Sequence, residues 1–155
     1  MPMRKDKPLL PPRERALGLL ARREHSAREL KRKLQQKGVA AEEAGAVVGD
    51  MGERNYQSDE RFAASLVRRR ALDGYGPLRI RAELATHGIV REAASAALET
   101  AEIDWIAIAR RVFASKFRGS EAADYKERQK RAAWLGARGF DAAVIRAVTR
   151  VEVED

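Results

Sequence analysis

The sequence has 155 residues, of which 45% are hydrophobic, and it carries a net charge of +8. This apolar fraction excludes wholesale disorder, and the length suits one compact domain or several small modules that share surfaces. The chain contains no cysteine, which excludes disulfides, thiolate zinc sites and cysteine nucleophiles, and no apolar run approaches the roughly 20 residues of a membrane span.

The first twelve residues differ in composition from the rest of the chain. Four of the five prolines lie within residues 1–12, and proline is rare inside helices because its ring fixes φ and its nitrogen carries no hydrogen. Residues 1–12 are therefore predicted to be a flexible, Pro-rich basic tail. Their cationic residues are not followed by the apolar segment that a secretory signal needs, so a cytoplasmic location is expected.

Beyond the tail, apolar residues recur at three- and four-residue steps, as at Leu17 and Leu20 and again at Leu30 and Leu34. This spacing is typical of helices that bury one face, and no alternation typical of a strand accompanies it. The chain is therefore predicted to be all-α.

A repeated pattern divides the helical part into three units. Residues 30–39 match residues 80–89, with apolar residues, a glycine and a final apolar residue at the same positions, and residues 131–140 form a weaker copy with Arg131 at an apolar position. A glycine followed by an apolar residue is typical of a helix end. Three tandem three-helix repeats are predicted to form an elongated, curved helical array. Their predicted bounds are 13–54, 55–103 and 104–155.

Charge alternates with the same period. Residues 13–37 carry nine cationic and three anionic side chains, whereas residues 38–60 carry one and six, and the two later repeats follow the same order. The first two helices of each repeat are thus basic and the third is acidic. We hypothesise that stacked repeats align their basic faces, which is typical of proteins that bind a polyanion or an acidic protein surface.

Polar residues at fixed places predict the helix boundaries. Ser58-Asp59-Glu60, Ser120-Glu121 and Asp141 have side chains that cap helix N-termini. The segment Gly74–Pro77 is predicted to be a turn between two helices. Five aromatic residues at helical core positions are interpreted as packing residues: Phe62, Trp105, Phe113, Trp134 and Phe140.

No pattern in the sequence indicates catalysis or metal binding. Phosphate-binding loops of the Walker type are absent, and the adjacent acids Asp59 and Glu60 fit helix initiation better than acid–base chemistry. His25 and His87 are far apart and lack the spacing of metal ligands. Both are predicted to lie near helix C-termini, which favour protonated histidine. No enzyme activity, cofactor or metal is expected.

Three separated segments, in order, resemble the RecX family. The first runs from Ala16 to Ser26 and continues with Glu29-Leu30 and Leu34. The second is Tyr-Gln-Ser-Asp-Glu-Arg-Phe-Ala at residues 56–63, and the third is Gly-Tyr-Gly-Pro-Leu-Arg-Ile at residues 74–80, followed by Leu84 and Gly88-Ile89. The resemblance covers residues 13 to about 150. Arg54-Asn55 departs from it, because the family commonly has glycine or a small acidic residue there.

This resemblance implies a non-enzymatic regulator of the RecA recombinase. It implies binding along the groove of the RecA–DNA filament, bridging neighbouring subunits, and restraint of filament extension, ATP hydrolysis and strand exchange. Recombination, DNA repair and the SOS response would be moderated in consequence. No catalytic residues come with the family. A monomer is expected, with DNA contacts that do not depend on sequence.

Basic residues at equivalent places in the repeats are candidates for contact with the filament or with DNA. The arginine pairs 22–23, 68–69 and 110–111 recur at matching positions, but each pair fits a solvated helix face equally well. Tyr75 either stacks on a base or a partner side chain, or packs its own turn onto the core. The candidates are Arg22, Arg23, Lys31, Arg32, Lys33, Arg68, Arg69, Arg70, Tyr75, Arg79, Arg81, Arg110 and Arg111.

Two other functions compete with the filament regulator. Short helices with basic charge also suit a stand-alone DNA-binding protein, although the predicted second helices lack the Asn- and Gln-rich face that reads bases. A helical scaffold for acidic proteins, without nucleic acid, is the third possibility. The sequence leaves the mode of inhibition and the orientation of the repeats open.

Overall fold

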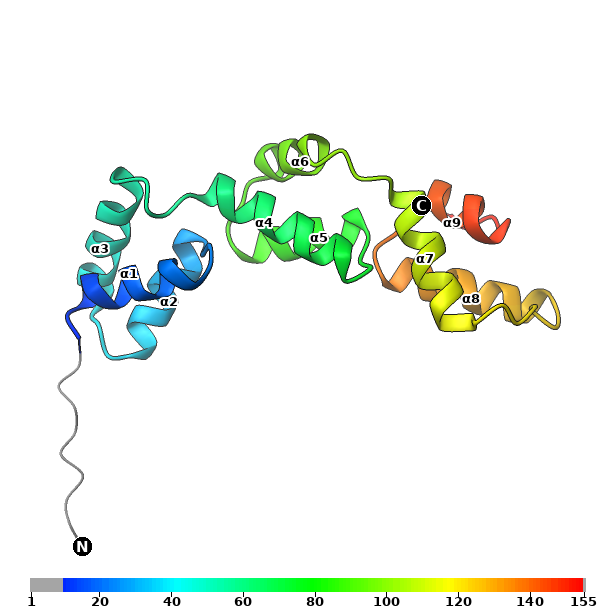
Figure 1. Cartoon of the computed structure of the whole chain (residues 1–155), viewed down its shortest axis with the longest axis horizontal. Helices are drawn as coiled ribbons and strands as arrows, with labels where there is room; N and C mark the ends of the chain where they lie inside the picture. Colours follow the sequence, from blue (N-terminus) through cyan, green and yellow to red (C-terminus); the bar gives the residue numbers. More distant parts are fainter. Residues whose placement is uncertain (1–9, 155) are drawn as a thin grey trace, which may run out of the picture. The chain divides into compact units, whose positions relative to one another are not determined.

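The computed structural model describes residues 10–154, and the helices within this range follow one another in three groups of three (Figure 1). The first module consists of α1 (Pro12–Arg22), α2 (Ala27–Gln36) and α3 (Ala41–Glu53). The second consists of α4 (Asp59–Leu72), α5 (Pro77–Thr86) and α6 (Arg91–Thr100). The third consists of α7 (Trp105–Phe117), α8 (Tyr125–Ala137) and α9 (Ala142–Thr149).

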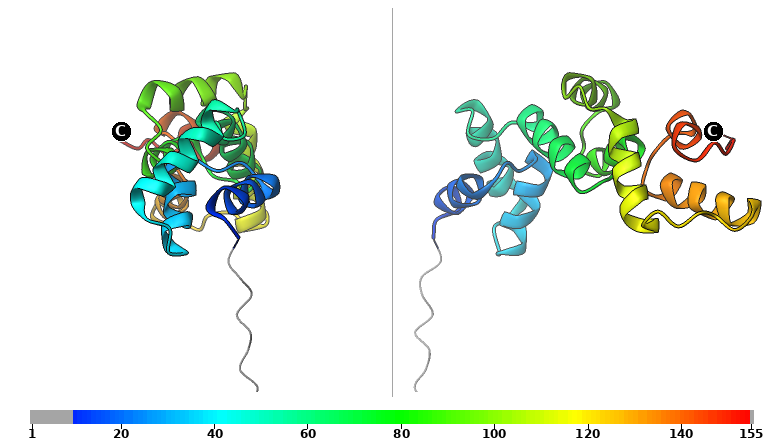
Figure 2. Two further views of the ribbon diagram at one scale, coloured as in Figure 1. Left: turned by 90° about the vertical axis from the view of Figure 1, so that its left-hand side faces the viewer. Right: turned by 45° about the vertical axis from the view of Figure 1, so that its right-hand side comes forward.

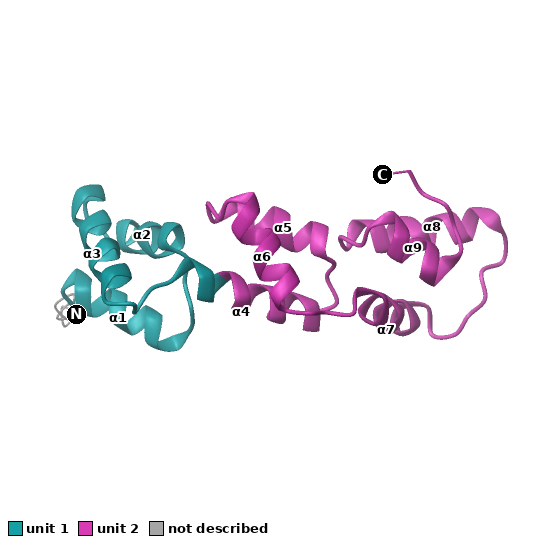
Figure 3. Ribbon diagram, turned by 90° about the horizontal axis from the view of Figure 1, so that it is seen from above, with its two compact units in different colours: residues 1–62 teal, residues 63–155 magenta. Residues whose placement is uncertain are grey.

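The all-α repeat array is confirmed, since residues 10–154 contain no strand. The predicted tail falls mainly on residues 1–9, outside the described residues, and α1 already begins at Pro12. The chain divides into two compact units, one that ends at Phe62 and one that begins at Ala63 (Figure 3). The boundary between the units therefore lies inside α4. Within the second unit, α8 and α9 lie beside one another, and α7 packs against α9 (Figure 2).

The repeated glycines end helices as predicted. Gly38, Gly88 and Gly139 follow α2, α5 and α8, and each has a positive φ. In all three places the next residue returns its N–H to the carbonyl of the leucine five positions earlier, at 3.1, 3.1 and 3.3 Å. This bond closes the last turn and folds the apolar side chain back toward its own helix. The same helix-end motif therefore recurs in each module.

Two predicted helix caps are confirmed and one is wrong. Ser58 Oγ accepts the N–H of Arg61 at 3.2 Å, and Asp141 Oδ1 accepts that of Val144 at 3.0 Å. Ser120 does not start a helix, because its hydroxyl donates to the carbonyl of Phe117 in the turn that follows α7. Asp124 caps α8 instead, since it directly precedes the first helical residue and accepts an N–H at 2.8 Å.

Each module buries its own small set of apolar side chains. In the first module Leu30, Leu34 and Met51 are fully buried. In the second, Ile80 and Leu84 of α5 are fully buried. In the third, the predicted packing of the aromatic residues holds: Phe140 is buried, and the three partly buried aromatic residues that pack against this core are Trp105, Phe113 and Trp134. Phe62 of α4 is buried as well.

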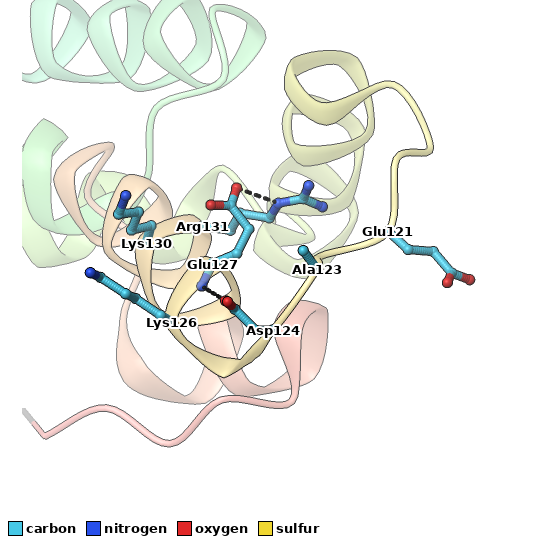
Figure 4. A pocket seen from close by; sticks show the side chains of 7 residues that line it. All are labelled: Glu121, Ala123, Asp124, Lys126, Glu127, Lys130 and Arg131. Atoms are coloured by element: carbon cyan, nitrogen blue, oxygen red, sulfur yellow. Dashed lines mark hydrogen bonds and ion pairs between the residues drawn. The ribbon is translucent and has the colours of Figure 1, made fainter.

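Arg131 occupies the place where the repeat pattern predicts an apolar residue. Its residue is 8% exposed, and its guanidinium carbon lies 4.5 Å from the centre of the Phe117 ring. The guanidinium donates to the carbonyl of Ser120 at 2.7 Å and pairs with Glu127 at 3.3 Å (Figure 4). The aliphatic part of the side chain thus fills the core position while its charged end is satisfied at the edge. None of the helices in residues 10–154 combines the length and the apolar character needed to cross a bilayer.

The burial pattern predicts very different effects for one substitution at two leucines of the second module. Leu84→Ala removes a fully buried side chain and is expected to lower the free energy of unfolding by about 2–5 kcal/mol. Leu72→Ala changes a residue that is 75% exposed and is expected to alter the free energy of unfolding by less than about 0.5 kcal/mol. Urea unfolding followed by circular dichroism measures both. Equal losses at the two positions would contradict the described core.

Candidate functional site

Four arginines of the second unit lie on two helices, near the end of α4 and on α7, which a hydrogen bond from Arg111 joins. Arg68 and Arg69, close to the end of α4, are exposed. Arg111 on α7 donates to the carbonyl of Leu72 at 3.0 Å, which places it at the C-terminal end of α4. Arg110, its neighbour on α7, is exposed. We call Arg68, Arg69, Arg110 and Arg111 the α4–α7 arginine cluster.

This cluster can bind oxyanions. Guanidinium groups keep their charge at all physiological pH values, and their planar arrangement of donors matches the oxygens of carboxylates and phosphates. Arg111 also donates to the last carbonyls of α4, where positive charge is favoured by the helix dipole. Two of the three predicted arginine pairs therefore lie on helices that Arg111 joins, and all four of these arginines are exposed to solvent.

Arg70 and Arg81, also predicted as contacts, have partners inside the second module. Arg70 donates two hydrogen bonds to the carboxylate of Glu83 at 2.8 and 2.7 Å and so joins α4 to α5. These hydrogen bonds lower the pKa of Glu83 and raise that of Arg70. Arg81 donates to Ser95 Oγ at 2.6 Å and joins α5 to α6. The two side chains thus tie the helices of the module together.

Tyr75 lies in the predicted turn between α4 and α5, and its ring is covered by two arginines. The guanidinium carbons of Arg79 and Arg138 each lie 4.3 Å from the centre of the ring. Arg138 is the residue that follows α8, so this contact joins the second module to the third. The geometry favours the interpretation of Tyr75 as a packing residue over a free stacking surface. Arg79 is an exposed residue even though its guanidinium group lies over this ring.

In the first module, the arginine pair 22–23 divides between surface and interior. Arg22 is exposed in the last turn of α1, whereas Arg23 makes two hydrogen bonds to the carboxylate of Glu29, at 2.9 and 2.8 Å. Burial alone would raise the pKa of Glu29, but the hydrogen bonds and charge of Arg23 lower it. This pair fixes the turn between α1 and α2. On α2, Lys31 is half-buried and Arg32 is exposed.

His25 is neutral and buried, so the prediction of a protonated histidine is wrong for this residue. Its Nδ1 lies 3.0 Å from the carbonyl of Arg23, and its Nε2 lies 3.0 Å from Lys33 Nζ. The first contact requires a donor on the ring and the second an acceptor, because an ammonium group only donates. Burial lowers the pKa of His25, and the charges of Arg23 and Lys33 lower it further. Lys33 is therefore engaged inside the module.

The start of α4 supplies polar contacts that the sequence did not reveal. Asp59 Oδ1 accepts the N–H of Ala27, the first residue of α2, at 2.9 Å. Arg61 Nε donates to Glu24 at 3.0 Å, and Gln57 Nε2 donates to the carbonyl of His25 at 3.3 Å. These residues lie in the first unit. Asp59 thus caps a helix 32 residues away from it in the sequence rather than its own.

Asn55, where the sequence departs from the RecX pattern, takes the left-handed conformation with φ of 62°. Asparagine tolerates this conformation better than most residues. Both its side-chain oxygen and its carbonyl accept hydrogen bonds from Arg61, at 3.0 and 2.8 Å. The departure therefore preserves the turn that ends α3.

A hollow of about 330 Å³ beside the start of α8 contains none of the predicted contact residues (Figure 4). Acidic and basic side chains both line it, and Asp124 and Arg131 are already committed to hydrogen bonds with the α8 backbone and the turn before it. Such mixed charge gives the hollow no preference for an anion or a cation.

Comparison with known proteins identifies the family. Models of the first, second and third three-helix domains of RecX match residues 13–51, 58–98 and 102–149. The chain belongs to the RecX family. It is 50% identical over 144 residues to "Regulatory protein RecX" of Xanthomonas oryzae pv. oryzae, which covers 93% of this chain and 89% of that protein. It is 47% identical over 144 residues to the protein of the same name from Stenotrophomonas maltophilia, with 93% and 88% covered.

Solved structures of RecX proteins share the fold. A crystal structure of regulatory protein RecX matches with a TM-score of 0.76 at 21% identity, over 90% of this chain and 70% of that one. The crystal structure of RecX from Lactobacillus salivarius matches with a TM-score of 0.68 at 19% identity, over 90% and 92% of the two chains. The three family domains coincide with the three modules described above.

The environment of His25 predicts a pH dependence of stability. Because its pKa is lowered from 6.5 in the folded protein, the unfolded chain binds a proton that the folded chain does not. The contribution of neutral His25 to the free energy of unfolding should therefore be fully present above about pH 6.5. Below that pH the free energy of unfolding should fall, by at most about 1.4 kcal/mol per pH unit. Urea titrations between pH 5 and 8 measure this slope.

The matched variant is His25→Gln, whose amide can both donate and accept but does not titrate. It is expected to flatten the slope between pH 5 and 6.5. Glu29 and Glu83, whose pKa values are lowered below 4.5, change the pH dependence of stability only at more acidic pH. An identical slope in both proteins over this window would refute the neutral, buried state of His25.

Proposed function

We propose that this chain is a regulatory protein that binds the RecA–DNA filament and restrains ATP hydrolysis, filament extension and strand exchange. Through this restraint it moderates recombination, DNA repair and the SOS response. It acts by occupying space on the filament rather than by chemistry of its own. Membership of the RecX family supports the proposal, together with the shared name of its relatives from Xanthomonas and Stenotrophomonas.

The observation that carries the proposal is the α4–α7 arginine cluster. All four of its members are exposed, and Arg111 is the one whose guanidinium group donates a hydrogen bond to the end of α4. A filament offers two matching surfaces, the phosphates of DNA and the acidic side chains of the protein coat. Phosphate contacts position a protein without reading sequence. Such contacts suit a partner that must bind wherever the filament lies.

The proposal narrows the set of contact residues. We infer that the exposed arginines contact the filament: Arg22, Arg32, Arg68, Arg69, Arg79 and Arg110. Lys31 remains a weaker candidate, since it is half-buried. We assign Arg23, Lys33, Arg70 and Arg81 to the support of the modules, because each is held by a partner in its own module.

One pair of assays separates this function from its alternatives. ATP hydrolysis by preassembled RecA filaments is measured with increasing amounts of the protein, and its affinity for naked DNA is measured across a salt series. The proposal expects inhibition at concentrations well below those that saturate free DNA. Steep salt-dependent duplex binding without inhibition would instead indicate a stand-alone DNA-binding protein. Absence of both effects would leave a scaffold for acidic proteins.

Neutralising two exposed arginines should weaken the inhibition. Arg68→Gln with Arg69→Gln is expected to raise the half-inhibitory concentration roughly tenfold, because two exposed ion pairs contribute about 0.5–1 kcal/mol each and about 1.4 kcal/mol is a factor of ten. Glutamine keeps the helix propensity near that of arginine. ATP hydrolysis by the filament measures the change, and circular dichroism confirms the helical content.

The matched control is Lys126→Gln with Lys130→Gln, which removes the same charge from exposed positions on α8 (Figure 4). It is expected to leave the half-inhibitory concentration within about twofold of the unmodified protein. Equal weakening by both double variants would show that net charge acts rather than the α4–α7 arginine cluster.

A further inference from the structure

The turn between α4 and α5 lies against the turn between α8 and α9, and main-chain N–H groups of the first donate to carbonyls of the second (Figures 1 and 3). The N–H of Gly76 donates to the carbonyl of Arg138 at 2.8 Å, and the N–H of Leu78 donates to that of Gly139 at 3.0 Å. Both turns lie in the second unit. Backbone of the second module is therefore bonded directly to backbone of the third.

The approach of the two turns requires glycine on both sides. A Cβ atom at Gly76 would overlap the backbone of Gly139, and one at Gly139 would overlap Arg79, including its backbone nitrogen. Gly139 also has φ of 98°, a conformation that other residues rarely adopt. Because the obstructing atoms include backbone, a larger residue at either position would push the turns apart.

Side chains close the same junction. Arg138 Nε donates to the carbonyl of Gly74 at 2.9 Å and Nη2 to that of Asp73 at 2.8 Å, while its guanidinium group stacks on Tyr75. Arg111 adds its hydrogen bond to Leu72 from α7. The guanidinium group of Arg138 thus donates to two carbonyls and lies over an aromatic ring. These bonds occupy donors that an external partner would otherwise use.

We propose that Gly76, Gly139, Tyr75 and Arg138 form a clasp that sets the position of Arg68 and Arg69 relative to Arg110, so that all three engage the filament together. Arg138 and Tyr75 are then positioning residues and do not touch the filament. This inference rests on the proposed function. Without the clasp, α7 and the end of α4 would meet the filament independently, and binding would lose the advantage of simultaneous contact.

The geometry of the clasp is tested in the full chain by the distance between two spin labels. The chain has no cysteine, so Ala96→Cys on α6 and Ala133→Cys on α8, both exposed, give unique attachment sites. A narrow distance distribution is expected for the unmodified clasp. Arg138→Ala removes the side-chain bonds, and Gly76→Ala separates the turns without removing any group. Each is expected to broaden the distribution while circular dichroism shows unchanged helical content.

Arg128→Ala is the matched control, because it removes an exposed arginine of α8, the helix that Arg138 follows, outside the clasp. It is expected to leave the distance distribution narrow. A distribution that stays narrow in both clasp variants would overturn the clasp, whatever the protein does to RecA. This measurement is therefore independent of the proposed function.

The positioning role is tested by ATP hydrolysis of RecA filaments at several salt concentrations. Both clasp variants are expected to raise the half-inhibitory concentration about tenfold and to reduce the dependence of inhibition on salt, because fewer cations bind at once. A protein that was merely less stable would keep the original salt dependence. Broadened distances with unchanged inhibition would overturn the positioning role, whereas failure of the unmodified protein to inhibit would overturn the proposed function on which it rests.

Discussion

The hydrogen bonds between the α4–α5 turn and the α8–α9 turn join segments that lie more than 60 residues apart in the sequence. Each module alone has a core of a few apolar side chains, too small to give much independent stability. Repeat proteins of this kind depend on the contact between neighbours. In the second unit, that contact includes main-chain hydrogen bonds and arginine side chains, and glycine at positions 76 and 139 allows the backbones to meet.

The positive charge of the chain serves two separate purposes. One group of arginines satisfies buried or half-buried acceptors: Arg70 binds Glu83, Arg131 binds the turn after α7, and Arg138 binds the turn after α4. The other group, which includes Arg68 and Arg69, is exposed. Arginine suits both purposes, because its planar group makes several directed hydrogen bonds and never loses its charge. Net charge alone therefore overstates the cations available to a partner.

The fold was predictable from the sequence because its signals are local. The helical spacing of Leu30 and Leu34, and the glycine that follows each repeated helix, report on residues within one or two turns. Asp141 was recognised as a cap for the same reason. Ser120 has the residue type of a cap, but Asp124, four residues later, takes that role because it directly precedes α8.

The site was only partly predictable, because its contacts join distant residues. The sequence indicated which arginines recur, but not that Arg23 would bind Glu29 or that Lys33 would bind a neutral His25. Nothing in the sequence around Arg138 indicates its contact with the α4–α5 turn, because Gly139 beside it already accounts for the local pattern as a helix end. The pattern of a basic residue before glycine at residues 37–38 and 138–139 is visible in the sequence. What the arginine binds follows only from the three-dimensional structure.

Amide hydrogen exchange at Gly76 and Leu78 tests the main-chain contact between the two modules most directly. If that contact holds the second and third modules as one body, these two amides exchange only on global unfolding, as slowly as amides inside α8. Exchange at the rate of exposed turn amides would show that the turns separate in the folded protein, and would contradict the account.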